Sequence, residues 1–528
     1  MRPCDFHVGS RAVLLALAVC VSACSTVDDS PLEQGEAESQ GTGGDGDGDG
    51  DGDGESDGAD ESDEGDTGDG DPGPEQSGDH VEDPPSPMTM CEPEAAQGLA
   101  IGLRDAQLEA APELVRARVL TGDGAVPQIP LASTPFFNHF DHGYEPASGW
   151  DPQLSGELWS SPMVNNAAPP RYHLQYAVRG PAMSPQERLS VDLAVVVDLG
   201  SAMSGEAMDL AEDALAALDT ALAPGDRVTL IGAGEQPALL GTVVVEGYGL
   251  APLTSLLDQE GLVPAATEAA LEAALELAYD GLATPYEGQG QPRVVLISNG
   301  HFDAEPLEDR VEEAAHDGRT LIAVGVGDPT LFDEAGMRAL AEQGRGPMLF
   351  AADAEQLWAE LSDQFIANTL VAATDLEVHL TLPPGLTFRQ RGPAADPIDE
   401  LDDEAKLATL GPNDALVFHH EIEACATLEA DAVIRVELEW TDPLTQTAKQ
   451  ADWSIPLAEA AEDASLRGQK GAATVAYVRA LRSFRDDLAA TQDYSRVLDA
   501  ISLVSGALEA MPEDGDLMEM SLVLARLF

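Results

Sequence analysis

The chain has 528 residues, of which 96 are Asp or Glu and only 26 are Lys or Arg, so its formal net charge at pH 7 is −70. Such an acidic chain repels phosphates, which excludes nucleic acid as a partner and excludes adsorption to anionic lipid through a basic patch. The length is sufficient for two or three domains, and the 44% of hydrophobic residues can supply a core.

Residues 1–23 have the features of a signal peptide, because two arginines precede an apolar stretch, residues 12–21, that is too short to span a bilayer. The stretch ends in Val-Ser-Ala-Cys, which is similar to the lipobox of bacterial lipoproteins. This resemblance implies that Cys24 becomes the N-terminus and carries acyl chains such as palmitate, which together anchor a protein firmly. By the sorting pattern of that family, Ser25 at the next position implies transport to the outer membrane rather than retention at the inner one. The alternative is an ordinary secretory signal with a chance cysteine.

Residues 24–94 are predicted to be a disordered acidic tether. The segment is dominated by Asp, Glu and Gly and has almost no aliphatic residues, so it cannot offset its ordering entropy by burial. Asp53, Glu55, Asp57 and Glu64 come close to the ligand pattern of an EF-hand loop. No helical pattern flanks them, so we expect weak and diffuse calcium association rather than a specific site.

Two cysteines remain after the expected processing, because Cys4 and Cys20 leave with the signal peptide and Cys24 carries lipid. These are Cys91 and Cys425. Both a disulfide bond between them, which an oxidising envelope permits, and two independent thiols are compatible with the sequence.

Residues 95–188 are predicted to form a folded N-terminal segment that opens with a helical stretch, residues 102–120. The densest aromatic cluster of the chain follows in residues 133–147. His139 and His142 lie within it, but no further metal ligand is evident in the sequence. We therefore favour a packing and turn segment over a metal site.

Residues 189–369 alternate between apolar strands and amphipathic helices, which predicts an α/β fold with a doubly wound parallel sheet. Residues 191–198, "VDLAVVVD", form the continuous apolar run expected of a parallel strand buried on both faces. Ligands of such sheets bind beyond the carboxyl ends of the strands. Asp198 and Asn299 each end a predicted strand, so both should face that crevice.

These residues resemble a von Willebrand factor type A (VWA) domain. "DLGSAMSGEAM" stands where the family has Asp-x-Ser-Gly-Ser-Met-x-Gly, Thr267 stands at its threonine, and "SNG" stands at its Thr-Asp-Gly. The similarity extends over roughly residues 100–528 to bacterial VWA lipoproteins that carry an N-terminal segment and a C-terminal extension. Intact members of the family have a metal-ion-dependent adhesion site, in which a carboxylate of the partner completes the coordination of the metal ion.

The resemblance also shows which ligands are missing. The family site uses an aspartate, two serines, a threonine and a second aspartate. Asp198 and Thr267 match, but Gly200 and Ala202 occupy the serine positions and Asn299 replaces the second carboxylate. Because magnesium requires six hard oxygen ligands, we predict that neither Mg²⁺ nor Ca²⁺ binds with useful affinity, and no cofactor is expected.

A metal-free network is the structural alternative for these positions. The carboxylate of Asp198 can accept backbone N–H groups, Thr267 can cap the following helix, and Asn299 can both donate and accept. Ser201 and Ser204 lie at the wrong steps from Asp198 and would join a metal site only if the loop were rebuilt.

Residues 370–458 contain alternating strands, which predict a small antiparallel sandwich, and residues 459–528 are predicted to be helical. His419 and His420 are adjacent on one of these strands. Their side chains should point to opposite faces, which disfavours a joint metal site.

Two functions compete. The first is a metal-independent protein-interaction or scaffolding module tethered to the cell envelope, with a protein partner and a membrane contact through its lipid. The second is a metal-dependent adhesion protein that uses a remodelled site with Ser201 or Ser204. An enzyme is not expected, because the sequence has no nucleophile elbow, phosphate loop or zinc-ligand spacing.

Overall fold

The computed structural model describes ten stretches of the chain: residues 97–101, 110–161, 170–246, 253–257, 264–265, 269–282, 291–389, 409–429, 431–487 and 494–528. The predicted signal peptide, the lipidation site Cys24, the tether, Cys91 and Thr267 lie outside the described residues. No helix in the described stretches is both long and apolar enough to cross a membrane.

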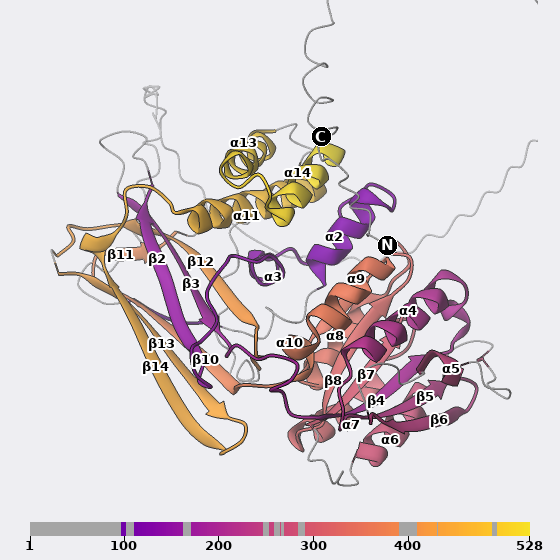
Figure 1. The fold of residues 1–528 in the computed structure, drawn as a ribbon. Coiled ribbons are helices and arrows are strands. Elements are labelled where there is room, and N and C mark those ends of the chain that lie inside the picture. The colour runs from indigo at the N-terminus through magenta and orange to yellow at the C-terminus, as the bar shows by residue number, and fades with distance from the viewer. Residues whose placement is uncertain are drawn as a thin grey trace, which may run out of the picture. The chain divides into compact units, whose positions relative to one another are not determined.

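The central sheet has six strands in the order β6-β5-β4-β7-β8-β9 (Figure 1). Four neighbouring pairs are parallel, and β6 runs antiparallel to β5 at one edge. Every residue of β4 is buried, which is why the sequence shows a continuous apolar run there. The doubly wound α/β fold is therefore confirmed. The strands are β4 (Val191–Asp198), β5 (Arg227–Ala233), β6 (Pro237–Val244), β7 (Gln291–Ser298), β8 (Thr320–Val326) and β9 (Met348–Ala351).

Helices cover both faces of this sheet. One apolar core combines the sheet with α4 (Glu206–Ala221), α5 (Leu253–Leu257), α9 (Ala354–Trp358), a π-helical turn η2 (Ala359–Asp363) and α10 (Phe365–Thr369). The other core combines it with α2 (Ala111–Leu120), α6 (Leu271–Leu282), α7 (Glu305–His316) and α8 (Glu334–Gln343).

The folded part opens with a strand, and the prediction that it opens with a helix was wrong. Strand β1 (Gln97–Ile101) precedes the predicted helix and pairs antiparallel with β10, with Gln97 opposite Leu382. This five-residue edge strand is hydrogen-bonded to a strand far away in the sequence. Its own residues therefore give little indication that they form a strand. Helix α2 lies in the second half of the predicted helical stretch.

A sandwich of two four-stranded antiparallel sheets stands beside the central sheet in the chain's folded unit, with strand orders β1-β10-β13-β14 and β11-β12-β3-β2. Strands from before and after the VWA-like region share its core. The antiparallel sandwich expected from residues 370–458 therefore also contains three strands of the N-terminal segment. The remaining strands are β2 (Gln153–Ser160), β3 (Arg171–Arg179), β10 (Thr374–Leu382), β11 (Leu386–Phe388), β12 (Ala415–Ala424), β13 (Val433–Asp442) and β14 (Thr447–Pro456).

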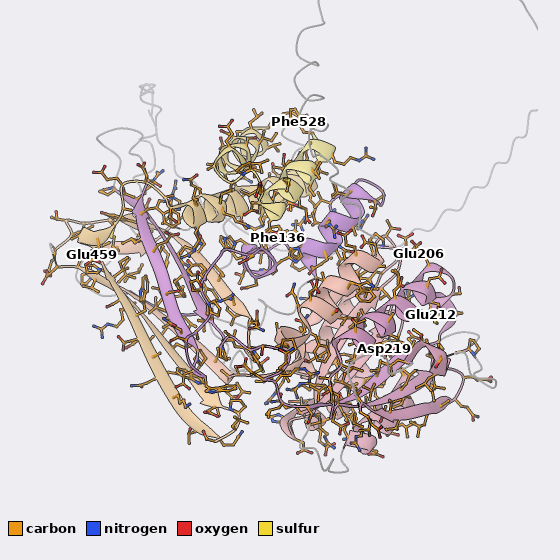
Figure 2. The ribbon with its side chains drawn as sticks, in the orientation of Figure 1. Phe136, Glu206, Glu212, Asp219, Glu459 and Phe528 are labelled. Atoms are coloured by element: carbon orange, nitrogen blue, oxygen red, sulfur yellow. The ribbon has the colours of Figure 1, made fainter. Side chains whose placement is uncertain are left out.

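The C-terminal region is helical, as predicted, and packs on the N-terminal segment. Phe136 of α3 (Ser133–His139), labelled in Figure 2, meets Tyr477 edge-on, with ring centroids 5.8 Å apart. The C-terminal helical elements are α11 (Leu466–Arg482), η5 (Ser483–Asp487), α13 (Ser495–Ala510) and α14 (Gly515–Leu527), and a short turn, η4 (Leu457–Glu459), precedes them.

Helix α2 joins two cores. Leu114 and Ala117 lie in the core of the central sheet, whereas Val115 and Val119 lie in the core formed with the C-terminal helices. A helix buried on two sides needs apolar residues around most of its circumference, which explains its weak amphipathic pattern.

Candidate functional site

The loops that follow β4 and β7 meet at one edge of the central sheet. These strands are parallel neighbours, and Val197 is paired with Ile297. The next residue of each strand is polar: Asp198 on β4 and Ser298 on β7. Both are buried, with Asp198 only 3% exposed.

Both carboxylate oxygens of Asp198 accept hydrogen bonds from the protein. The backbone N–H of Gly200 donates to Oδ1 at 2.7 Å, and the Ser298 hydroxyl donates to Oδ2 at 2.6 Å. Burial raises the pKa of Asp198, while these two hydrogen bonds and the charge of His301 act to lower it. Donors aimed at the carboxylate are what permit a charge at this depth.

Asn299 connects the two loops. Its side-chain Nδ2 donates to the carbonyl oxygen of Ala202 at 2.8 Å, and its Oδ1 accepts from the backbone N–H of His301 at 3.3 Å. An aspartate could not make the first of these bonds, because a carboxylate has no donor. Gly300 follows with φ +83°, and a Cβ there would lie 2.0 Å from the carbonyl oxygen of Asp333. The turn therefore requires glycine.

Gly200 and Ala202, the two other described positions of the expected adhesion site, take part in this network through their backbone. Gly200 precedes a short 3₁₀ turn, η1 (Ser201–Met203), and Ala202 is exposed within that turn. Ser201 and Ser204 are exposed as well. Ser298 was not singled out from the sequence. The available signal was its position at the end of a buried strand, level with Asp198.

The aromatic segment 133–147 packs into the interior, with Phe136, Phe137 and Tyr144 buried. His142 is also buried and stacks on Phe137 at 4.8 Å between ring centroids. Burial, with smaller effects from the charges of Lys470 and Arg467, lowers the pKa of His142 to about 3. His142 is therefore a neutral packing residue, as predicted.

His139 has a different environment from the one expected. The sequence showed no further ligand beside it, but the fold brings the carboxylates of Glu113 and Glu360 within 4.8 Å. These residues come from three separate elements, so no sequence spacing connects them.

His419 and His420 point to opposite faces of β12, as predicted. The ring of His419 contacts His173, Trp159 and Phe137, whereas that of His420 stacks on Tyr176.

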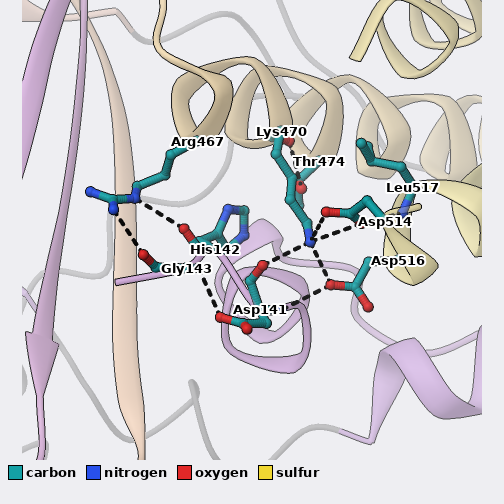
Figure 3. Close-up of polar contacts among 9 residues, drawn as sticks. All are labelled: Asp141, His142, Gly143, Arg467, Lys470, Thr474, Asp514, Asp516 and Leu517. Atoms are coloured by element: carbon teal, nitrogen blue, oxygen red, sulfur yellow. Dashed lines mark hydrogen bonds and ion pairs between the residues drawn. The ribbon is translucent and has the colours of Figure 1, made fainter. Parts of the chain in front are cut away.

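A buried lysine fastens the C-terminal helices to the aromatic segment (Figure 3). Lys470 Nζ lies 2.8 Å from a carboxylate oxygen of Asp514 and 2.6 Å from one of Asp516, and it donates to the carbonyl of Asp141 at 2.7 Å. Arg467 donates to the backbone carbonyl of His142 at 3.0 Å. All the hydrogen-bonding capacity of the ammonium group is used within the protein, which indicates a structural role.

Comparison with known proteins identifies the central domain. The family described as the von Willebrand factor type A domain matches residues 191–350, and the sheet and helices have the VWA arrangement. A von Willebrand factor type A structure from Catenulispora acidiphila is 14% identical with a TM-score of 0.42, covering 71% of this chain and 96% of that chain. The ArnB paralog VWA2 from Sulfolobus acidocaldarius is 15% identical with a TM-score of 0.37, covering 71% and 98%. No curated protein matches the chain. The family match over residues 191–350 shows that the chain contains a VWA domain.

Proposed function

We propose that the VWA domain of this chain is a metal-independent protein-interaction or scaffolding module, held at the outer membrane by lipid on Cys24. One observation carries the proposal: Asp198, which would be the main metal ligand, has both oxygens hydrogen-bonded to the protein at 2.6–2.7 Å. These bonds orient the carboxylate toward Ser298 and Gly200, so a divalent ion at this position would have only the remaining lone pairs of Asp198 available.

The chemistry of the neighbouring positions supports the same conclusion. Gly200 and Ala202 have no side-chain oxygen, and the Asn299 amide is bonded to the Ala202 carbonyl. A site with one carboxylate offers little compensation for removing water from Mg²⁺, which dehydrates reluctantly. Recognition then depends on the shape and charge of the protein surface, and the domain needs no catalytic group or cofactor.

Calorimetry with Mg²⁺, Mn²⁺ and Ca²⁺ tests metal independence. We compare the full chain with the single variant Asp198→Ala and expect identical heats, because any diffuse binding by the acidic segments is common to both. A metal-binding heat that disappears with Asp198→Ala would overturn the proposal and favour a remodelled adhesion site that uses Ser201 or Ser204.

A restored site gives the matched positive control. The triple variant Gly200→Ser, Ala202→Ser, Asn299→Asp returns the missing oxygens, and Gly200 has φ −62°, which a serine accepts. We expect this variant to gain Mg²⁺ binding that the parent chain lacks.

The anchor and the partner require experiments in cells. We expect Cys24→Ala to move the protein out of the membrane fraction, and we expect crosslinking from the loops around Ala202 to capture a protein partner equally well with and without EDTA. Loss of the crosslinked product in EDTA that Mg²⁺ or Ca²⁺, but not Zn²⁺, restores would contradict metal independence, and membrane retention of Cys24→Ala would contradict lipid anchoring.

A disulfide bond supports export. Cys425 is disulfide-bonded, and all other cysteines lie outside the described residues. We propose Cys91 as its partner, since it is the only other cysteine after Cys24. Structural disulfide bonds persist in oxidising compartments such as the bacterial envelope. Peptide mapping without reduction should recover the Cys91–Cys425 pair.

A further inference from the structure

Three ionisable side chains meet where the N-terminal segment contacts the VWA domain. Glu113 comes from the first turn of α2, His139 is the last residue of α3, and Glu360 lies in the π-helical turn η2. One potential ligand atom from each lies within 4.8 Å of the others. π-helical turns inside α-helices are frequent at functional sites, because the extra residue redirects a side chain.

Glu113 is only partly satisfied by the protein. Its Oε1 lies 3.1 Å from His139 Nδ1. The residue is 91% buried, and its Oε2 has no hydrogen-bond partner among the described residues. A buried carboxylate oxygen without a donor is costly, and a bound ion is one of the ways in which a native fold satisfies such a group.

Two arginines near this cluster are engaged elsewhere, and a third, Arg345, lines the same cavity as the cluster. Arg116 is paired with Glu519 at 3.2 Å, and Arg293 donates to the backbone carbonyls of Thr369 and Pro292. Within the cluster itself, two carboxylates face a single imidazole.

The pKa values of His139 and Glu360 reflect this excess of negative charge. Burial alone would lower the pKa of His139, but the charge and hydrogen bond of Glu113, with the charges of Glu519 and Glu360, raise it to about 9. Burial and the charge of Glu113 raise the pKa of Glu360 to about 7.

We propose that Glu113, His139 and Glu360 form a binding site for a divalent transition-metal ion, with Zn²⁺ as the best-fitting ion. Ligand atoms about 2.0–2.1 Å from a tetrahedral zinc are roughly 3.4 Å apart, close to the 3.1 Å between Glu113 and His139. The other pairs need to close by at most about 1.4 Å, which side-chain rotation supplies. An imidazole ligand favours zinc over Mg²⁺ or Ca²⁺.

The surroundings suit a three-ligand site. The three residues line a cavity of about 110 Å³, which has room for a water molecule as the fourth ligand. Asn368 Nδ2 lies 3.3 Å from Glu360 Oε2 and donates to the Glu360 backbone carbonyl at 2.9 Å, so it orients the carboxylate from behind. A bound ion would fasten α2 and α3 to the last helical segment of the VWA domain. This site is separate from the Asp198 loops.

Zinc titration of the full chain tests the proposal. The protein is stripped with EDTA, and free zinc is set with a competing chelator so that weak binding by acidic segments does not register. We expect one tight equivalent, a raised Tm on zinc addition, and intense visible absorption when four-coordinate Co²⁺ is bound instead. His139→Asn and Glu360→Gln should each lose at least tenfold in zinc affinity and lose the Co²⁺ spectrum.

Matched controls come from an exposed pair on α7. His316 lies 3.7 Å from Glu312, and both side chains are more than half exposed. His316→Asn and Glu312→Gln should leave zinc affinity unchanged. Circular dichroism and Tm in EDTA establish that every variant is folded. If the parent chain binds no tight zinc, or if folded His139→Asn binds it equally well, His139 is an imidazolium ion between two carboxylates and the proposal is wrong.

Discussion

The Asp198 loops and the Glu113 cluster differ in the way that matters most for metal binding. The first occupies the place where a VWA domain holds its ion, yet Asp198 has a protein donor for each carboxylate oxygen. The second belongs to no sequence motif, yet it leaves Glu113 Oε2 buried without a partner. For these two clusters, a buried oxygen without a donor is therefore better evidence for an ion site than a sequence that still resembles a metal-binding motif.

Removing the carboxylate from the satisfied site should have the largest effect. Asp198→Ala leaves the Ser298 hydroxyl and the Gly200 N–H without their acceptor in a buried position. We expect the free energy of unfolding to fall by about 3 kcal/mol, since each stranded donor costs about 1–3 kcal/mol. Urea unfolding measures it, with Ser204→Ala, an exposed position, as a control within about 0.5 kcal/mol. A loss below about 1 kcal/mol would mean that the network does not stabilise the loops.

A smaller effect is expected from the residue that connects the two loops. Asn299→Ala removes the bonds to Ala202 and His301, which should cost about 1–2 kcal/mol. Asn299→Asp keeps the acceptor but places a carboxylate against the Ala202 carbonyl oxygen, so it should cost as much in EDTA. If Asn299→Asp alone is stabilised by Mg²⁺, one carboxylate is enough to rebuild the ion site, and the contrast between the two clusters is weaker than we infer.

The features of the Asp198 loops that follow from local sequence patterns could be predicted from the sequence. The central strands were predictable because burial on both faces imposes a continuous apolar run, as in β4. Asp198 and Asn299 were predictable because parallel strands present their carboxyl ends at one edge. Ser298 was missed although it follows from that rule, because which neighbour faces Asp198 depends on strand order and register.

Features that combine segments far apart in the chain could not be predicted from the sequence. Strand β1 depends on pairing with β10, and the sandwich joins strands from both sides of the VWA domain. His139 was assigned to packing because no ligand lay near it in the chain. Glu113 and Glu360 reach it only after α2 has packed between two cores, and no local pattern records that packing.

The smallest expected effect concerns Asp219 of α4, which resembles Glu113 rather than Asp198. It is 5% exposed, its Oδ2 accepts only a long bond of 3.3 Å from the Leu253 N–H, and its Oδ1 has no partner. Figure 2 places it on the same helix as the exposed Glu206 and Glu212. A substitution of Asp219 tests whether a buried carboxylate with an unpartnered oxygen lowers the free energy of unfolding where no candidate metal cluster has been described.

Burial raises the pKa of Asp219 from its usual 3.8 to about 6. Between these values the folded protein binds more protons than the unfolded chain, so the stability contributed by this group falls as the pH rises from about 4 to 6. At pH 7 the buried charge of Asp219 lowers the free energy of unfolding. Asp219→Asn keeps an acceptor for Leu253 and removes the charge, so unfolding should require about 1 kcal/mol more at pH 7 and the same free energy as the parent at pH 4. Glu212→Gln, an exposed change on the same helix, should have no effect at either pH.

If Asp219→Asn destabilises the protein at pH 7, a buried carboxylate with a free oxygen is tolerated in this fold without an ion, and the argument from Glu113 loses its main support.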